Sequence, residues 1–148
     1  MVQKADFERV LATPSRSRST HFAVHHVNGG PCASRWHQLH PASAELSTGD
    51  AQSGAQPVDD SRRVVPDGCW LGSIVPKRHA RRSVTRVLLK RQIRAAMARH
   101  ADTLAPGLWV VRLRAPFAPS QYPSAASDAL RLAAHSELEQ LFGRARRA

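Results

Sequence analysis

The stretch of residues 69–99 constrains the fold most, because it joins an apolar run to a long basic one. It contains nine lysines and arginines and no aspartate or glutamate. Residues 69–75 form an apolar run that predicts a strand, and residues 76–78, which begin with proline, predict a turn. The pattern that follows predicts a helix over residues 80–100. A strand, a turn and a basic helix are therefore expected in succession.

The predicted helix carries two stripes of different character. Leu89, Ile93 and Met97 recur every four residues, so they lie on one face of a helix. A basic stripe with the same spacing is displaced around the axis and consists of Arg82, Arg86, Lys90 and Arg94. One face is therefore expected to be buried against a core, whereas the other is expected to meet an anion.

Apolar periodicity predicts four further elements, two of them helices and two of them strands. The helices are expected over residues 6–11, where Asp6 is a candidate N-cap, and over residues 127–144, where Ser127 is one. The strands are expected over residues 20–27 and 108–114. This order predicts an α+β fold in which helices cover a small mixed β-sheet.

Residues 28–67 interrupt the pattern. They are rich in Gly, Pro, Ser, Ala and Gln and poor in large apolar side chains. Such a segment buries too little apolar surface to order itself, so it is expected to be a long loop or disordered insertion outside the body of the fold. The chain, residues 1–148, is otherwise expected to be a single domain.

The charge of the chain points to a polyanionic partner. The formal net charge is +11 and the isoelectric point of the sequence is about 11.4. Nucleic-acid phosphates are the commonest polyanion, although an anionic membrane surface fits the charge equally well. No apolar run approaches the roughly 18 residues of a membrane-spanning helix, so no membrane span is predicted.

Cysteine usage favours a cytoplasmic protein. Cys32 and Cys69 share no short metal-ligand spacing, and two thiols in a chain of this size are typical of a reducing compartment. Residues 1–20 lack the continuous apolar stretch of a secretory signal.

The sequence offers no candidate catalytic or metal-binding set. No Gly-x-Ser-x-Gly nucleophile motif is present, and Asp67 is the only acidic residue between residues 61 and 101. No cysteine or carboxylate completes a four-ligand zinc site with the histidines of the N-terminal third. These histidines are His21, His25, His26, His37 and His40.

Five short segments in a fixed order suggest a family. In residues 71–94, a strand beginning Leu-Gly runs into a Lys-Arg turn and then into a basic helix. The other four segments are residues 6–11, 22–25, 109–111 and 138–142. Together these segments resemble the bacterial ribonuclease P protein component, over most of the chain outside residues 28–67.

The resemblance implies both a fold and a role. The implied fold is ribosomal protein S5 domain 2-like, with the basic helix inside a β-α-β unit. The implied role is that of a protein subunit that assists an RNA-catalysed endonuclease in removing the 5′ leader from precursor tRNA. The partners would be the catalytic RNA and precursor tRNA, with Mg²⁺ bound mainly by the RNA and the protein alone inactive. The resemblance gives no oligomeric state.

Two sets of residues would carry that role. The catalytic RNA would be bound by Lys77, Arg78, Arg81, Arg82, Arg86, Lys90, Arg91 and Arg94. A cleft for the leader would be lined by Phe7, Leu11, Phe22 and His25. The plainer alternatives are a solvated basic face for the first set, and core packing of Phe7 and Phe22 for the second.

The sequence also departs from the family pattern. Val87 and Leu88 replace the family's Asn and Arg, and Leu11 and His25 stand where aromatic residues are usual. A generic RNA-binding or ribosomal-type protein is therefore the alternative function. A DNA-binding helix protein is disfavoured, because neither a helix-turn-helix pair nor basic-zipper heptads follow residue 94.

Overall fold

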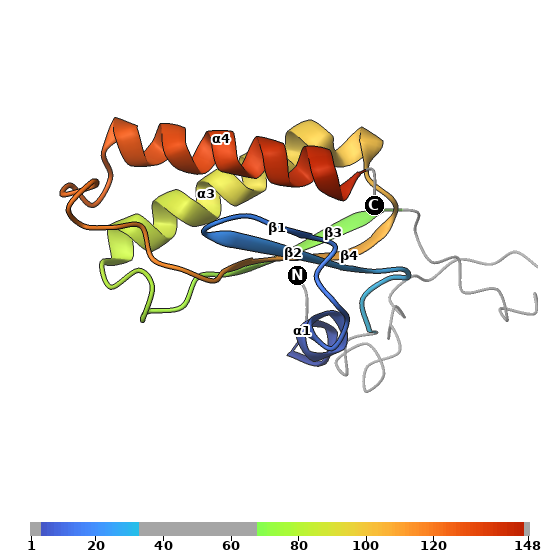
Figure 1. Cartoon of the computed structure of the whole chain (residues 1–148). Helices are drawn as coiled ribbons and strands as arrows, with labels where there is room; N and C mark the ends of the chain where they lie inside the picture. The colour runs from blue at the N-terminus through green and yellow to red at the C-terminus, as the bar shows by residue number, and fades with distance from the viewer. Residues whose placement is uncertain (1–3, 33–67, 147–148) are drawn as a thin grey trace, which may run out of the picture.

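The computed structural model describes residues 4–32 and 68–146, which form one α+β domain with four strands and three α-helices (Figure 1). The helices are α1 (Lys4–Leu11), α3 (Ser83–His100) and α4 (Asp128–Ala145), and a short 3-10 helix, Ala101–Thr103, follows α3. The strands are β1 (Ser17–Arg18), β2 (Phe22–Val27), β3 (Cys69–Ile74) and β4 (Gly107–Leu113). The predicted α+β fold is confirmed.

The strands lie in the order β1-β2-β4-β3 within one mixed sheet. β2 runs antiparallel to β1 and β4, whereas β3 runs parallel to β4. Because α3 follows β3 and precedes β4, the basic helix is the crossover of a β-α-β unit, as predicted. Where β4 begins, Gly107 has a φ of +133°, and a Cβ there would lie 2.4 Å from the Val27 carbonyl oxygen. Only glycine fits this tight pairing of β4 with β2.

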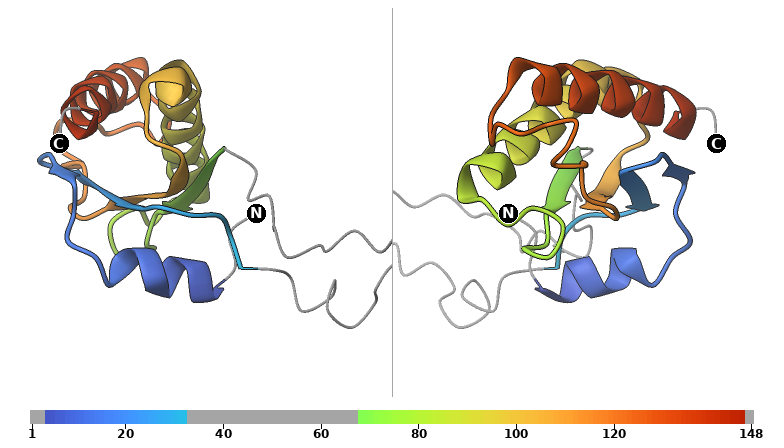
Figure 2. Two further views of the ribbon diagram at one scale, coloured as in Figure 1. Left: turned by 90° about the vertical axis from the view of Figure 1, so that its right-hand side faces the viewer. Right: turned by 60° about the vertical axis from the view of Figure 1, so that its left-hand side comes forward.

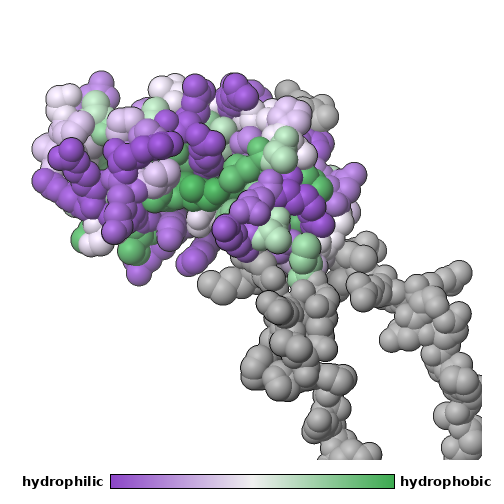
Figure 3. Space-filling model, turned by 90° about the horizontal axis from the view of Figure 1, so that it is seen from below, coloured by the Kyte–Doolittle hydropathy of each residue, from purple (hydrophilic) through white to green (hydrophobic). Residues whose placement is uncertain are grey.

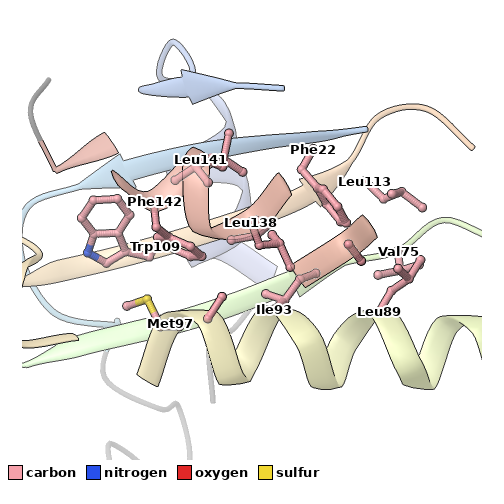
Figure 4. Packing of buried hydrophobic residues seen from close by; sticks show 14 of the residues in the cluster. Phe22, Val75, Leu89, Ile93, Met97, Trp109, Leu113, Leu138, Leu141 and Phe142 are labelled. Atoms are coloured by element: carbon pink, nitrogen blue, oxygen red, sulfur yellow. The ribbon is translucent and has the colours of Figure 1, made fainter. Parts of the chain in front are cut away.

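Helices α3 and α4 cover one face of the sheet, here called the upper face (Figures 1 and 2). Strand side chains alternate between faces, and Phe22, Trp109 and Leu113 are among those fully buried against these helices. The α3 stripe of Leu89, Ile93 and Met97 is buried as predicted (Figure 4). The buried face of α4 consists of Leu130, Ala134, Leu138, Leu141, Phe142 and Ala145. This packing forms the main core.

Helix α1 covers part of the opposite face, here called the lower face (Figure 1). Val10 packs with Leu108 and Val110, and all three are fully buried. Phe7 and Trp70 are partly buried against this smaller cluster. α1 has 8 residues whereas α3 and α4 have 18 each, so the lower face is less completely covered than the upper one.

The two predicted caps have different outcomes. The Ser127 hydroxyl accepts a hydrogen bond from the Leu130 N–H at 3.2 Å and caps α4, as predicted. Asp6 lies inside α1, which begins at Lys4, so its prediction as an N-cap is wrong. Its buried carboxylate instead accepts a hydrogen bond of 2.9 Å from the Cys32 N–H. This contact ties α1 to the segment that leaves β2.

The boundaries of several elements differ from those predicted. The strand expected over residues 20–27 begins at Phe22, and β1 was not expected because two residues show no periodicity. α3 begins at Ser83, since the Ala80 N–H donates to the Pro76 carbonyl oxygen at 3.1 Å within a turn. Of the loop expected at 28–67, residues 28–32 belong to no helix or strand, and residues 33–67 lie outside the described residues.

Candidate RNA interface

The basic side chains of the turn before α3 and of α3 itself stay open to solvent. All eight residues predicted to bind RNA are exposed except Arg86, which is half-buried. No acidic residue lies in the first turn of α3. Within residues 4–32 and 68–146, none of the eight forms an ion pair with a carboxylate. Their charge is therefore available to an anionic partner.

The last turn of α3 is different. Arg99 pairs with Glu139 of α4, donating from Nε at 2.8 Å. His100 Nε2 lies 2.8 Å from the other oxygen of the same carboxylate. The positive charge of this end is thus neutralised within the protein, where α3 crosses α4.

Arg86 has a structural contact as well as a place in the basic stripe. Its Nη1 donates to the carbonyl oxygens of Ala80, at 3.1 Å, and Arg81, at 2.6 Å. A guanidinium has five N–H donors, so these bonds fix the turn before α3 and leave other donors for a ligand. Arg82 similarly donates from Nη1 to the Pro123 carbonyl oxygen at 3.1 Å.

The two residues that depart from the family pattern have different environments. Val87 is 48% exposed, beside Val84 at 55%, so both are apolar side chains on the solvent face of α3. Leu88 is partly buried and packs against the main core. The apolar residue at position 88 therefore contributes packing, whereas nothing in the structure explains Val87.

Three of the four predicted cleft residues lie on the α1 side of the molecule. The ring of Phe7 lies so close to β3 that a Cβ on Gly72 would be 2.5 Å from a ring carbon. Leu11 packs at the edge of the same cluster. His25 is buried, and its Nδ1–H donates to the Thr13 carbonyl oxygen at 3.0 Å, which fixes the ring.

Phe22 does not belong with these residues. It is fully buried in the main core, where its ring lies 5.9 Å from that of Phe117. Residues three apart on a strand point to opposite faces, so Phe22 and His25 cannot line one cleft. The prediction of Phe22 as a cleft residue is corrected for this reason.

Three arginines outside the predicted site residues line a groove on the lower face. This groove of about 250 Å³, here called the sheet groove, is lined by Arg18, Ala23, His25, Arg112 and Arg114. Leu108, Val110 and Arg112 are every second residue along β4, so their side chains point to the same face, the lower one. That alternation was a usable signal in the sequence. Figure 3 shows this side of the molecule, with an apolar band between two hydrophilic areas.

A partly buried contact holds His21, the residue before β2, to Glu137 of α4. The carboxylate of Glu137 accepts hydrogen bonds from the backbone N–H of His21 at 2.6 Å and from its ring Nδ1 at 2.7 Å. Burial alone would raise the pKa of Glu137, but these hydrogen bonds, with one from Ser19, outweigh burial and lower the pKa. The folded structure therefore favours the ionised carboxylate of Glu137.

The described residues contain no group of three or more His, Cys, Asp or Glu side chains that could hold a metal ion. Searched over the same residues, no helix has both the length and the apolar character to cross a membrane.

Comparison with known proteins gives one consistent result. The family model described as Ribonuclease P matches residues 1–146. The curated "Ribonuclease P protein component" of Nostoc sp. is 31% identical over 113 residues, which cover 76% of this chain and 71% of the relative, and that of Trichormus variabilis matches equally well. The solved Staphylococcus aureus RNase P protein has a similar fold, with a TM-score of 0.54 and 19% identity over 97% of this chain and 91% of that one.

Proposed function

The chain belongs to the ribonuclease P protein family, and from this premise we propose that two separate surfaces serve two RNAs. A member of this family is the protein subunit of a ribonucleoprotein endoribonuclease, and its partner is the RNA of that enzyme. In the proposal, the exposed basic residues of the turn and α3 bind the catalytic RNA. The sheet groove and Phe7 hold the 5′ leader of precursor tRNA.

The observation that carries the first part is the distribution of ion pairs along α3. Lys90, Arg91 and Arg94 have no carboxylate partner in the described part of the chain, whereas Arg99 has one. A row of unpaired guanidinium and ammonium groups binds phosphates and releases their counterions, so affinity falls steeply with salt. The same stripe supports RNA binding even without a processing role, which is the alternative function.

The second part rests on the mixed character of the lower face. Arg112 and Arg114 line the groove and supply positive charge, and Phe7 supplies a half-buried ring that packs by Gly72 of β3 and the Val10, Leu108 and Val110 cluster. Single-stranded nucleotides bind surfaces that combine backbone charge contacts with stacking on an aromatic ring. The leader is such a strand, and stacking makes the contact tolerant of its sequence.

The composition of α3 supports different roles for the protein and the RNA. α3 carries no acidic side chain, so the carboxylate oxygens that Mg²⁺ prefers are missing from the basic face. We propose that the RNA holds the Mg²⁺ ions of the reaction, while the protein lowers the repulsion between two RNAs. In this proposal the chain acts as a single RNA-binding domain, in the cytoplasm.

The test is cleavage of precursor tRNA by a bacterial ribonuclease P RNA at low Mg²⁺, with and without the full-length protein. We expect the protein to restore cleavage at the mature 5′ end, because its positive charge replaces part of the screening that Mg²⁺ supplies. Binding to the RNA without restored cleavage would instead favour the generic RNA-binding function.

A further inference from the structure

A cavity of about 320 Å³ opens between the turn before α3 and the loop that joins β4 to α4. In Figures 1 and 2 this loop lies beside the first turn of α3. We call the cavity the loop cavity. The lining residues used in the argument are Arg78, Arg81, Arg82, Phe117, Tyr122 and Pro123. The loop cavity is separate from the sheet groove, since the two share no lining residue.

The loop side of the cavity is held in place before any ligand arrives. Thr85 of α3 donates to the Ala125 carbonyl oxygen at 2.7 Å, and Arg82 donates to that of Pro123 at 3.1 Å. Within the loop, the Tyr122 N–H donates to the Ala118 carbonyl oxygen at 3.0 Å. Proline residues further restrict the backbone there. A preformed cavity binds its ligand at a smaller cost in entropy.

One wall of the cavity is aromatic. The ring of Phe117 is stacked on His21, with centroids 3.9 Å apart and an interplanar angle of 12°, so it is fixed from behind. Tyr122 meets Phe117 edge-on, with centroids 5.6 Å apart and planes at 84°. Phe117 is buried whereas Tyr122 is partly exposed. Tyr122 is therefore the ring on which an incoming planar group can stack.

The rim of the cavity is positively charged. Arg78, Arg81 and Arg82 are exposed, and no acidic side chain lines the cavity. Arginine presents a planar fork of donors that matches phosphate oxygens. The volume lies at the small end of the range for ligand pockets, about 300–1,000 Å³, which suits one planar group rather than a stretch of strand.

We propose that the loop cavity receives one unstacked nucleotide of an RNA strand, with its base against Tyr122 and its phosphate on the arginine rim. The proposal rests on the proposed function, because the rim arginines also belong to the basic surface assigned to the catalytic RNA. That continuity favours a nucleotide within RNA over a free nucleotide. The cavity thereby adds a base-stacking contact to a surface that otherwise offers charge.

The test follows NMR signals of the full-length protein during titration with uridine, UMP, inorganic phosphate and hexauridylate. The methyl groups of Ala80 and Ala125 report on the cavity, and that of Ala23 reports on the sheet groove. We expect hexauridylate to shift the cavity signals at a concentration at least about tenfold below that of UMP. Uridine or phosphate alone should shift them less than UMP does.

Variants of the loop sharpen this test. Tyr122→Ala should weaken hexauridylate binding at the cavity about tenfold, since a stacked base is lost, whereas Tyr122→Phe should retain it. Gln121→Ala, an exposed neighbour, is the matched control and should have no effect. The wild-type titration decides the question even where a variant folds poorly.

Two results would overturn the proposal. Hexauridylate that shifts the Ala23 signal but not the cavity signals would remove the cavity from RNA binding. UMP that binds the cavity as tightly as hexauridylate would assign the cavity to a free nucleotide. Neither result bears on the proposed function, which is judged by cleavage at low Mg²⁺.

Discussion

The two faces of the sheet differ in how completely they are covered. Two helices of 18 residues seal the upper face, where Trp109 and Leu138 are fully buried. One helix of 8 residues covers the lower face and leaves a groove lined by arginines beside it. This small domain therefore concentrates its stability on one face and leaves polar sheet surface open for a ligand on the other.

The largest expected effect is a loss of stability from a substitution in the core of the upper face. Leu138→Ala should lower the free energy of unfolding by about 2–5 kcal/mol, because it leaves a cavity in the main core. Leu132→Ala on the same helix is the matched control, since Leu132 is 65% exposed, and it should change stability by less than about 0.5 kcal/mol. Urea unfolding followed by circular dichroism measures both. Equal losses in the two variants would contradict the assignment of the core.

The next effect concerns the middle of α3, compared with its last turn. The double variant Lys90→Gln/Arg94→Gln should weaken binding to the catalytic RNA and make the slope of log K against log salt shallower by about 1–2, since two phosphate contacts are lost.

The control for that variant is Arg99→Gln, because Arg99 pairs with Glu139 inside the protein. It should leave the salt slope unchanged and cost at most about 1 kcal/mol of stability, as expected for a partly exposed ion pair. The account of α3 fails if Arg99→Gln changes the slope as much as the double variant does.

The smallest effect is a dependence of stability on pH. The folded protein lowers the pKa of Glu137, so the unfolded chain binds more protons as the solution becomes acidic. The resulting stability is present above the ordinary glutamate pKa of about 4.3, and it is lost as pH falls through the lowered value. Glu137→Gln should reduce the fall in melting temperature as pH drops below the ordinary glutamate pKa. A part of that fall due to Glu139, whose pKa is also lowered, should remain. An unchanged pH profile in the variant would exclude this role.

The sequence predicted those parts of the fold that depend on local periodicity. The apolar stripe of α3, the apolar face of α4 and the central strands show a regular spacing over several turns or residue pairs. β1 has only two residues and no pattern to detect. Asp6 resembles an N-cap because it precedes an apolar periodic run. Its observed partner, the Cys32 N–H, lies 26 residues away and leaves no local pattern in the sequence.

The functional surfaces were less predictable for a physical reason. Exposed basic residues on one helix follow from spacing alone, so the α3 stripe could be identified. The grouping of Phe22 with His25 ignored the alternation of strand side chains, and the same alternation would have added Arg112 to the lower face. The loop cavity joins segments about 40 residues apart, as the contact between Thr85 and Ala125 shows, and no short-range pattern encodes it.

One binding experiment separates the two proposed RNA surfaces. It compares the affinity of the reconstituted holoenzyme for precursor tRNA and for mature tRNA, using Arg112→Gln/Arg114→Gln in the sheet groove and Lys90→Gln/Arg94→Gln in α3. The account predicts that the groove variant loses most of the preference for precursor while it binds the catalytic RNA as tightly as the wild type. The α3 variant should bind the catalytic RNA more weakly yet keep the preference once saturated. A groove variant that keeps the full preference, or that loses catalytic-RNA binding instead, would contradict the account.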